Sequence, residues 1–416
     1  MKSTSENKGT WSFVEAEGMR SRPSVSGLVI NARDFTARLS VPVPGRHFLA
    51  VGRETNNQEY ARLKETAQTG SSQKTDQSEH QQADTLSIRT AAIFSTPRLP
   101  SDFAGLHNSG RSPADCSVAA GPSHLIMITG TTWAVMDKAG HQLLCSDLAT
   151  WFSDVSNEAI IGNPKVIYDQ FCGRWMIAAC GRSTDGKSSC FLFSVSQTRN
   201  PLGAWWNWAL DASLNGAGET NLVAEGLGFG LDNSAVYLTT NLFDDTGAFQ
   251  YAKLRILSKS ALLAGEALQW WDSWNLRNPD DSAIFGIQPA HTFGTPGIAY
   301  LLNATSEGQS LTQWRLTQPL SESPKLSRRA IPTVGYQLAP NARQPDSRIE
   351  IETGDTRLIN VVFRNGLLWT AHTVAANWGE ADNVSAIQWF QINTGAGIIS
   401  QQRITDILHL PISVRR

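Results

Sequence analysis

The chain has 416 residues and a formal net charge of −2, from 35 Lys and Arg residues against 37 Asp and Glu residues. A chain of this length can bury a large core. Its charge balance lacks the basic excess of a general nucleic-acid or membrane-surface binder. No apolar run reaches the roughly 18 residues that a membrane helix requires, and the N-terminus MKSTSENKGTWSF lacks the apolar core of a secretory signal. We therefore expect no nucleic-acid partner and no membrane span, and the compartment stays open.

The first hundred residues differ in composition from the rest. Residues 1–53 form an N-terminal extension, in which the β-branched and aromatic residues of 27–52 predict two or three short strands. These strands either pair with the main domain or form a separate, poorly ordered piece. Residues 54–100 are polar and, over 54–87, rich in Gln, Ser, Thr and Glu, which predicts a disordered linker. Residues 101–416 are the main domain.

A pattern recurs along the main domain. Each unit begins with an apolar run, a tight turn of Gly, Asn, Asp or Pro, and a second apolar run, which is typical of a β-hairpin. The five hairpins begin at Ser117, Lys165, Leu227, Pro289 and Arg357. A third segment then alternates apolar and polar residues, and a fourth, less regular segment closes each unit. The only helical turn that we expect is SKSALLAGEA, around Ala261 to Ala267.

Four antiparallel strands per unit, without a long helical pattern, describe the blades of a β-propeller. We therefore predict an all-β fold, a β-propeller of four-stranded antiparallel blades with about five blades visible. Either the N-terminal strands complete the ring or the ring is incomplete, since the final ILHLPISVRR could begin another blade. A pair of β-sandwiches and a β-solenoid are the competing folds, and the four-strand grouping and the repeat length disfavour them.

The 5 cysteines and 14 tryptophans favour packing roles. The cysteines form no C-x-x-C pair and lie in apolar contexts, where a reduced cysteine packs as a small hydrophobe. A cross-strand disulfide among Cys172, Cys180 and Cys190 is the alternative. The tryptophan clusters at 205–208 and 270–274 are expected to pack between sheets, with a sugar-stacking platform as the alternative.

Several motifs resemble those of a group of bacterial, mostly exported, predicted β-propeller proteins without an established activity. The motifs are SPADCSVAAGPSHLIMI, NPKVIYDQFCGRWMIAAC, LDNSAVYLTTNLF with LSKSALLAGEA, and GDTRLINVVFRNGLLWTAHTV. The resemblance spans roughly residues 101–410 and implies a propeller and a secreted or periplasmic location. The sequence departs from that group in three ways: Asn163 stands before Pro164 where an acidic residue is expected, no export signal is seen, and the C-terminal blade or blades of the group have no counterpart in the pattern.

Propellers bind ligands at the central channel, so polar residues beside the innermost strands form the candidate ligand-binding set: Asp115, Asp169, Arg174, Asn241, Arg357, Asn360 and His372. We expect four of them to converge on the channel around an anionic or hydroxyl-rich ligand: Asp115, Arg357, Asn360 and His372. Arginine suits a carboxylate because its planar fork makes two hydrogen bonds. The alternative is structural, since Asp and Asn beside turns cap the backbone and Asp169 and Arg174 could pair across their hairpin.

No catalytic residues can be assigned from the sequence. A sialidase-like enzyme needs an arginine cluster, a Tyr/Glu nucleophilic pair and an acid/base Asp. Tyr168 and Glu225 are available for that pair, but Ser183-Thr184-Asp185-Gly186 does not match the Ser-x-Asp-x-Gly turn of sialidases. We expect no cofactor. The alternative is calcium, held by the acidic loops at Asp244-Asp245, Asp280-Asp281 and Glu380-x-Asp382.

The sequence thus favours a non-enzymatic propeller module that binds a protein or carbohydrate partner through its loop face. A sialidase-like or other glycan-acting hydrolase is the first alternative. A truncated chain without independent function is the second, suggested by the abrupt ends.

Overall fold

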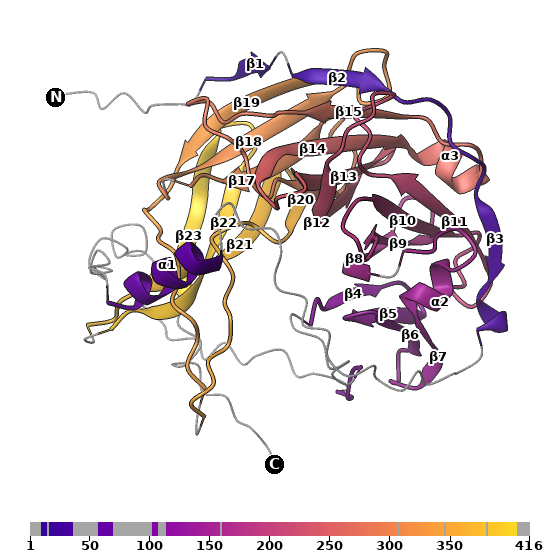
Figure 1. Ribbon diagram of the computed structural model, residues 1–416, viewed down its shortest axis with the longest axis horizontal. Coiled ribbons are helices and arrows are strands. Elements are labelled where there is room, and N and C mark those ends of the chain that lie inside the picture. The colour runs from indigo at the N-terminus through magenta and orange to yellow at the C-terminus, as the bar shows by residue number, and fades with distance from the viewer. Residues whose placement is uncertain are drawn as a thin grey trace.

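The computed structural model describes residues 10–35 except 15, 57–69, 102–106, and 114–405 except 159, 307, 345, 346, 380 and 381. Its strands form five blades arranged around a central axis (Figure 1). Within each blade, four consecutive strands pair antiparallel as a meander. The five predicted hairpins form the first two strands of the five blades, and the prediction of an all-β propeller is confirmed.

The strands of the blades are as follows. Blade 1 contains β4 (Ser117–Ala120), β5 (His124–Thr129), β6 (Thr132–Asp137) and β7 (Gln142–Asp147). Blade 2 contains β8 (Ile160–Asp169), β9 (Arg174–Arg182), β10 (Ser189–Ser196) and β11 (Ala204–Asp211). Blade 3 contains β12 (Val223–Leu231), β13 (Ala235–Phe243), β14 (Phe249–Ser258) and β15 (Trp270–Trp274). Blade 4 contains β16 (Gln288–Phe293), β17 (Ala299–Ala304), β18 (Ser310–Thr317) and β19 (Lys325–Pro332). Blade 5 contains β20 (Val361–Arg364), β21 (Leu367–Ala376), β22 (Val384–Asn393) and β23 (Ile398–Thr405).

The innermost strands of blades 3, 4 and 5 run parallel and are hydrogen-bonded to one another: β12 to β16, and β16 to β20. Glycine permits this close approach in β12. A Cβ on Gly230 would lie 2.6 Å from the carbonyl oxygen of Ala290, and one on Gly228 would lie 2.9 Å from Pro289. These three blades therefore form one continuous sheet, whereas blades 1 and 2 are separate sheets.

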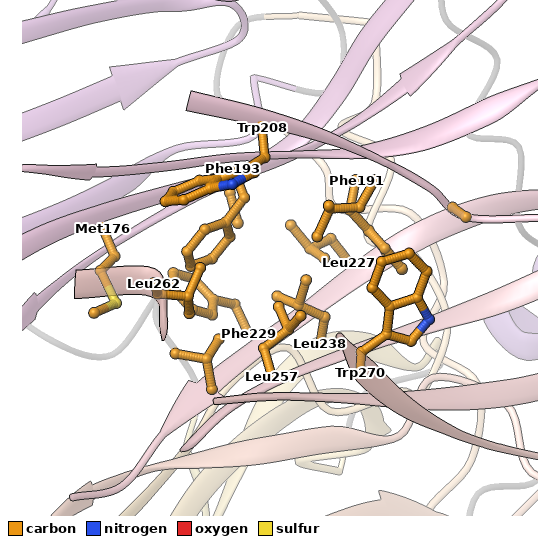
Figure 2. Close-up of a cluster of buried hydrophobic side chains, with 14 of the residues drawn as sticks. Met176, Phe191, Phe193, Trp208, Leu227, Phe229, Leu238, Leu257, Leu262 and Trp270 are labelled. Atoms are coloured by element: carbon orange, nitrogen blue, oxygen red, sulfur yellow. The ribbon is translucent and has the colours of Figure 1, made fainter. Parts of the chain in front are cut away.

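Between neighbouring blades, apolar side chains from facing sheets interdigitate. Figure 2 shows the cluster between blades 2 and 3, where Phe191, Phe193 and Trp208 meet Phe229 and Trp270. Phe193 and Phe229 make an edge contact, with ring centroids 5.7 Å apart. Of the six tryptophans in the two sequence clusters, three are buried as predicted, Trp205, Trp208 and Trp270, while Trp206, Trp271 and Trp274 are partly exposed. All five cysteines are free thiols.

The N-terminal segment runs along the outer edges of three blades. It contains β1 (Ser12–Val14), β2 (Glu17–Arg20) and β3 (Leu28–Asn31), followed by the 3-10 helix η1 (Ala32–Asp34). These strands pair antiparallel with β19, β15 and β11 of blades 4, 3 and 2 respectively. We call residues 10–35 the strap. Figure 1 shows it following the outside of the ring. The predicted pairing with the main domain is thus observed for β3, while the expected strands beyond residue 35 lie outside the described residues.

The strap does not close the ring, because it adds to the outside of blades that already have neighbours. Among the described strands, none of blade 5 pairs with one of blade 1. Figure 1 shows these two blades on either side of the open part of the ring. Of the two expectations for closure, completion by N-terminal strands is therefore wrong for the strands that the structure describes. An outer strand and a closing strand share the same residue pattern, so the sequence could not separate them.

Three α-helices accompany the described strands: α1 (Asn57–Thr69), α2 (Leu148–Phe152) and α3 (Lys259–Ala264). Helix α3 lies on the predicted helical turn. Helix α1 lies in the segment predicted to be a disordered linker, and it is ordered because Tyr60 and Lys64 are buried against blade 5 loops. The other residues of that linker, 54–56 and 70–100, lie outside the described part. Within the described residues, no helix is long and apolar enough to cross a membrane.

Candidate functional site

A pocket of about 230 Å³ lies at the end of the channel where the innermost strands begin. Every blade contributes to its lining. Its lining contains six residues with charged or amide side chains: Asp115, Asn163, Lys165, Asn241, Gln288 and Arg357. Because the innermost strands run in one direction around the axis, residues just before or at the start of each strand meet at this end.

The backbone at this mouth is irregular in blades 1, 2 and 3. Asp115 and Asn163 have φ angles of 45° and 50°, in the left-handed region that non-glycine residues rarely adopt. The backbone N–H of Asn163 donates to the Asp115 carboxylate at 3.3 Å. A bulge separates Gly162 from Lys165 in β8, and another separates Glu225 from Gly228 in β12. Bulges redirect side chains beside functional sites, and strained backbone concentrates there.

Glu225 borders the pocket at the bulge of β12. Its neighbour Gly226 and its cross-strand partner Asn241 both line the pocket. Its side chain is 15 % exposed and lies 3.6 Å from Arg182. Burial raises the pKa of the Glu225 carboxyl to about 7, although Arg182 and Arg357 oppose the shift. The Glu225 carboxyl is therefore partly protonated near neutral pH, whereas the carboxyl of an exposed glutamate is ionised there.

Arg357 is held in place by Asp355. Its Nε donates to Asp355 Oδ1 at 2.6 Å, and its terminal nitrogen pairs with the other carboxylate oxygen. The guanidinium also lies 4.7 Å from the centroid of the Phe285 ring. Burial alone would raise the pKa of the Asp355 carboxyl, but the charge and hydrogen bonds of Arg357 lower it. Both side chains are thus charged, and the positive charge of Arg357 is offset by the negative charge of Asp355 at the edge of the pocket.

Lys165 and Asp115 bring opposite charges to the pocket. Burial lowers the pKa of the Lys165 ammonium, and the Asp115 charge acts against that shift. The pocket consequently combines ionisable groups of both signs with the neutral amides of Asn163, Asn241 and Gln288. Such a mixture suits a polar, hydroxyl-rich ligand better than a highly charged one.

Three of the seven predicted ligand-binding residues meet in this pocket: Asp115, Asn241 and Arg357. The Asn241 side chain is buried, and its Oδ1 accepts from the backbone N–H of Gly286 at 3.0 Å. This contact joins blade 3 to the segment that leads into blade 4. Asn241 therefore shapes the wall of the pocket as well as lining it.

Asp169 and Arg174 lie at the opposite end of the channel, because Asp169 is the last residue of the innermost strand of blade 2 and Arg174 is the first residue of the next strand. Their backbones are cross-strand partners. The alternative considered for them was an ion pair across the hairpin. The Asp169 carboxylate instead pairs with Lys259 of α3, whose Nζ lies 2.9 Å away. Asp169 also accepts from the Phe171 N–H at 2.9 Å, which caps the turn.

Asn360 and His372 do not line the pocket, so the expected convergence of four residues differs from the structure. Asn360 is exposed, and its carbonyl oxygen accepts from Thr370 Oγ1 at 2.7 Å. His372 is buried, with Nδ1 2.6 Å from the Thr356 carbonyl oxygen and Nε2 3.0 Å from Gln388 Oε1. His372 therefore supports the Thr356–Arg357 loop from behind.

The residues considered for a sialidase do not assemble. Tyr168 packs against Trp175 near the far end of β8, with ring centroids 4.8 Å apart, whereas Glu225 lies at the pocket end of β12. The Tyr/Glu pair is thus split between the two ends of the channel. Of the pair, Glu225 alone lies beside the candidate site, next to the lining residue Gly226.

The acidic loops considered for calcium bind their own backbone. Asp244 accepts from the N–H groups of Thr246 and Ala248, at 3.0 and 2.9 Å. Asp280 accepts from the Ser282 N–H at 3.0 Å. Asp382 pairs with Arg343 at 2.8 Å, and Glu380 lies outside the described residues. In the part of the chain that the structure describes, no three His, Cys, Asp or Glu side chains gather as a metal site.

Sequence reasoning considered Glu225 only as a nucleophile partner and read Asn163 only as a departure from a motif. The signal that could have grouped them is positional. Asp115, Asn163 and Glu225 each lie at the start of the innermost strand in blades 1, 2 and 3. Residues at this repeat position converge whatever their type.

No protein-family model matches the sequence, and no curated protein matches it. Among solved structures, the GH43 endo-arabinanase from Bacillus licheniformis is 13 % identical and has a TM-score of 0.34, covering 69 % of this chain and 96 % of that chain.

Two further solved structures are similar at the same level. A xylan β-1,4-xylosidase from Bacillus halodurans is 15 % identical with a TM-score of 0.37, over 70 % of this chain and 56 % of that chain. A putative exo-β-1,3-galactanase from Bifidobacterium bifidum is 11 % identical with a TM-score of 0.37, over 72 % and 94 %. The assignment of this chain as a propeller rests on its own strand pairing.

Proposed function

We propose that the protein hydrolyses glycosidic bonds of a glycan bound in the channel pocket, with Glu225 as the proton donor. The observation that carries this proposal is the Glu225 carboxyl, whose burial raises its pKa to about 7 beside a pocket that also presents Asp115. Glycoside hydrolysis needs one protonated carboxyl and one carboxylate flanking the scissile bond. Different surroundings give these two acids the different protonation states that the reaction requires.

In the proposed reaction, Glu225 donates its proton to the glycosidic oxygen as the bond between that oxygen and the anomeric carbon breaks. Water adds to the anomeric carbon, and the Asp115 carboxylate accepts the proton that the water releases. The products are two shorter sugars, and proton exchange with solvent returns both acids to their starting states. Arg182, 3.6 Å from Glu225, stabilises the carboxylate that remains after donation.

The test is an assay of reducing-end release from a panel of arabinans, xylans and galactans, using the full chain. We expect Glu225→Gln and Asp115→Asn each to lower kcat by about 10²–10⁴-fold, the usual contribution of a positioned acid or base. Glu266→Gln is the matched control, because Glu266 is exposed beside α3, away from the pocket. Equal rates in the Glu225 and Glu266 variants would overturn the assignment of Glu225.

A carbohydrate-binding module without turnover is the second candidate. Asn163, Asn241 and Gln288 offer amide groups in the pocket that suit sugar hydroxyls, and Asn163 occupies a position where the resembling proteins lead us to expect an acid. Calorimetry on the same sugars separates the two functions. Binding without product release in the unmodified protein would favour the module.

A further inference from the structure

A second cavity, of about 190 Å³, adjoins the channel pocket. The two share Arg357, and Phe285 of the second cavity is followed directly by Gly286 of the first. The second cavity is formed by loops of blades 4 and 5 and by helix α1, which contributes Tyr60 and Leu63. A ligand that extends from the channel pocket past Arg357 would therefore enter a space that the propeller alone does not enclose.

Helix α1 is fixed in this position by polar contacts. Lys64 is 6 % exposed, and its ammonium donates to the carbonyl oxygen of Ala339 and to Thr353 Oγ1, both at 2.8 Å. Tyr60 donates from its hydroxyl to Glu352 Oε1 at 2.7 Å. Near the end of the helix, the Asn383 N–H donates to the Gln68 carbonyl oxygen at 3.0 Å. A buried lysine satisfied by carbonyl oxygens is costly to displace, so α1 forms a built wall of the cavity.

The chemistry of this cavity fits a neutral sugar. Phe285, Leu63 and Leu338 supply apolar surface, and the hydroxyls of Thr305 and Ser306 supply hydrogen-bonding groups. Sugar rings have an apolar C–H face and a polar hydroxyl edge, and this lining offers a partner to each. The one arginine of the lining already pairs with Asp355, which leaves it little net charge with which to attract an anion.

We propose that the second cavity is a subsite for a further sugar unit of the same glycan, and that α1 determines how long a glycan the site prefers. This inference rests on the proposed function, since it assumes that a sugar occupies the channel pocket. Leu63 is the sharpest probe, because it lines the cavity while its residue surface remains 43 % exposed. A larger side chain there would fill the cavity without disturbing a buried contact of the helix.

The experiment is calorimetric titration of the full chain with Glu225→Gln, which prevents turnover. The probes are arabino-, xylo- and galacto-oligosaccharides from the monosaccharide to the tetrasaccharide. We expect Leu63→Trp to weaken binding of the longer members by about tenfold or more, because the added bulk removes the contact surface of the second cavity. The affinity for the monosaccharide should be unchanged. Ala61→Trp is the matched control, because Ala61 is an exposed residue of α1 that does not line the cavity.

The outcomes separate the two proposals. If Leu63→Trp and Ala61→Trp behave alike along the whole series while the parent binds sugars, the subsite is wrong and the proposed function stands. If no sugar binds the parent, the proposed function fails and the subsite with it. Leu63→Ala guards against local misfolding, since it removes contact surface without adding bulk. It should weaken binding of the longer sugars in the same direction by a smaller factor.

Discussion

At the scale of single residues, Glu225 links the fold to the chemistry. Its carboxyl has a pKa of about 7 in the folded chain and an ordinary value of 4.5 when exposed. The folded state therefore binds a proton that the unfolded state releases between these two pH values. The contribution of Glu225 to folding stability is therefore most favourable below pH 4.5 and falls as pH rises toward 7, because the charged form must then be buried.

This predicts a pH-dependent effect of Glu225→Gln, which removes the titration. The free energy of unfolding of the variant, relative to the parent, should increase between pH 5 and pH 8, by at most about 3 kcal/mol. Urea unfolding at the two pH values measures the difference. The same titration predicts that hydrolysis slows as pH rises through 7, because the proton donor is lost. A variant whose relative stability is the same at both pH values would contradict the raised pKa.

A second residue-scale prediction concerns Arg255 and Asp272, which pair at 2.8 Å with both side chains fully buried. Asp272→Ala should reduce the free energy of unfolding by about 3–5 kcal/mol, because it leaves a buried guanidinium without its counter-charge. Asp382→Ala breaks an ion pair of the same length between exposed side chains and should cost about 1 kcal/mol or less. Similar losses in the two variants, measured by urea unfolding, would refute the argument.

The site was only partly predictable at this scale. Asp115 and Arg357 could be placed near the channel because both precede a predicted innermost strand. Asp169 was misplaced because it ends such a strand, and the two ends of one strand lie at opposite ends of the channel. The raised pKa of Glu225 depends on burial by residues distant in sequence, which a repeat pattern does not reveal.

At the scale of elements, the predicted strands agree with the structure where local pattern decides. The third and fourth segments predicted to follow each hairpin are present as strands, as β10 and β11 show in blade 2. Alternation and turn chemistry are local, so they are visible in the sequence. Helix α1 was missed because its order depends on Lys64 reaching carbonyl oxygens some 275 residues away, and its polar composition resembles that of a disordered segment.

The strap depends on glycines that let it approach buried tryptophans. A Cβ on Gly27 would lie 2.5 Å from the Trp208 ring. Gly27→Ala should therefore loosen β3 from β11 and reduce the free energy of unfolding by about 1–3 kcal/mol. Hydrogen exchange should be faster in residues 28–31 and unchanged in blade 5. Gly335→Ala is the matched control, because Gly335 likewise has no positive φ and a Cβ there would meet only the carbonyl oxygen of Gly308, at an ordinary 3.8 Å.

At the scale of the whole molecule, the five blades are unequally coupled. Blades 3, 4 and 5 share one hydrogen-bonded sheet, while blade 1 is a separate four-stranded sheet. Blade 1 packs one face on blade 2, and among the described residues a small apolar cluster covers its other face. Segments with fewer shared contacts open at lower free energy. Native-state hydrogen exchange in mild urea should thus show residues 117–147 opening before residues 223–317, and simultaneous opening would show that the ring unfolds as one unit.

The strap also sets an order of events during synthesis. The order of its three strands along the chain is opposite to the order of the blades that they pair with: β1 pairs with blade 4, β2 with blade 3 and β3 with blade 2. Ser12 leaves the ribosome 316 residues before its partner Arg328, a delay of roughly 15 to 60 seconds at ordinary rates of translation. Strand β1 can therefore pair only after blade 4 has been made, whereas β3 and β2 can cover the outer edges of blades 2 and 3 earlier, as each of those blades is completed.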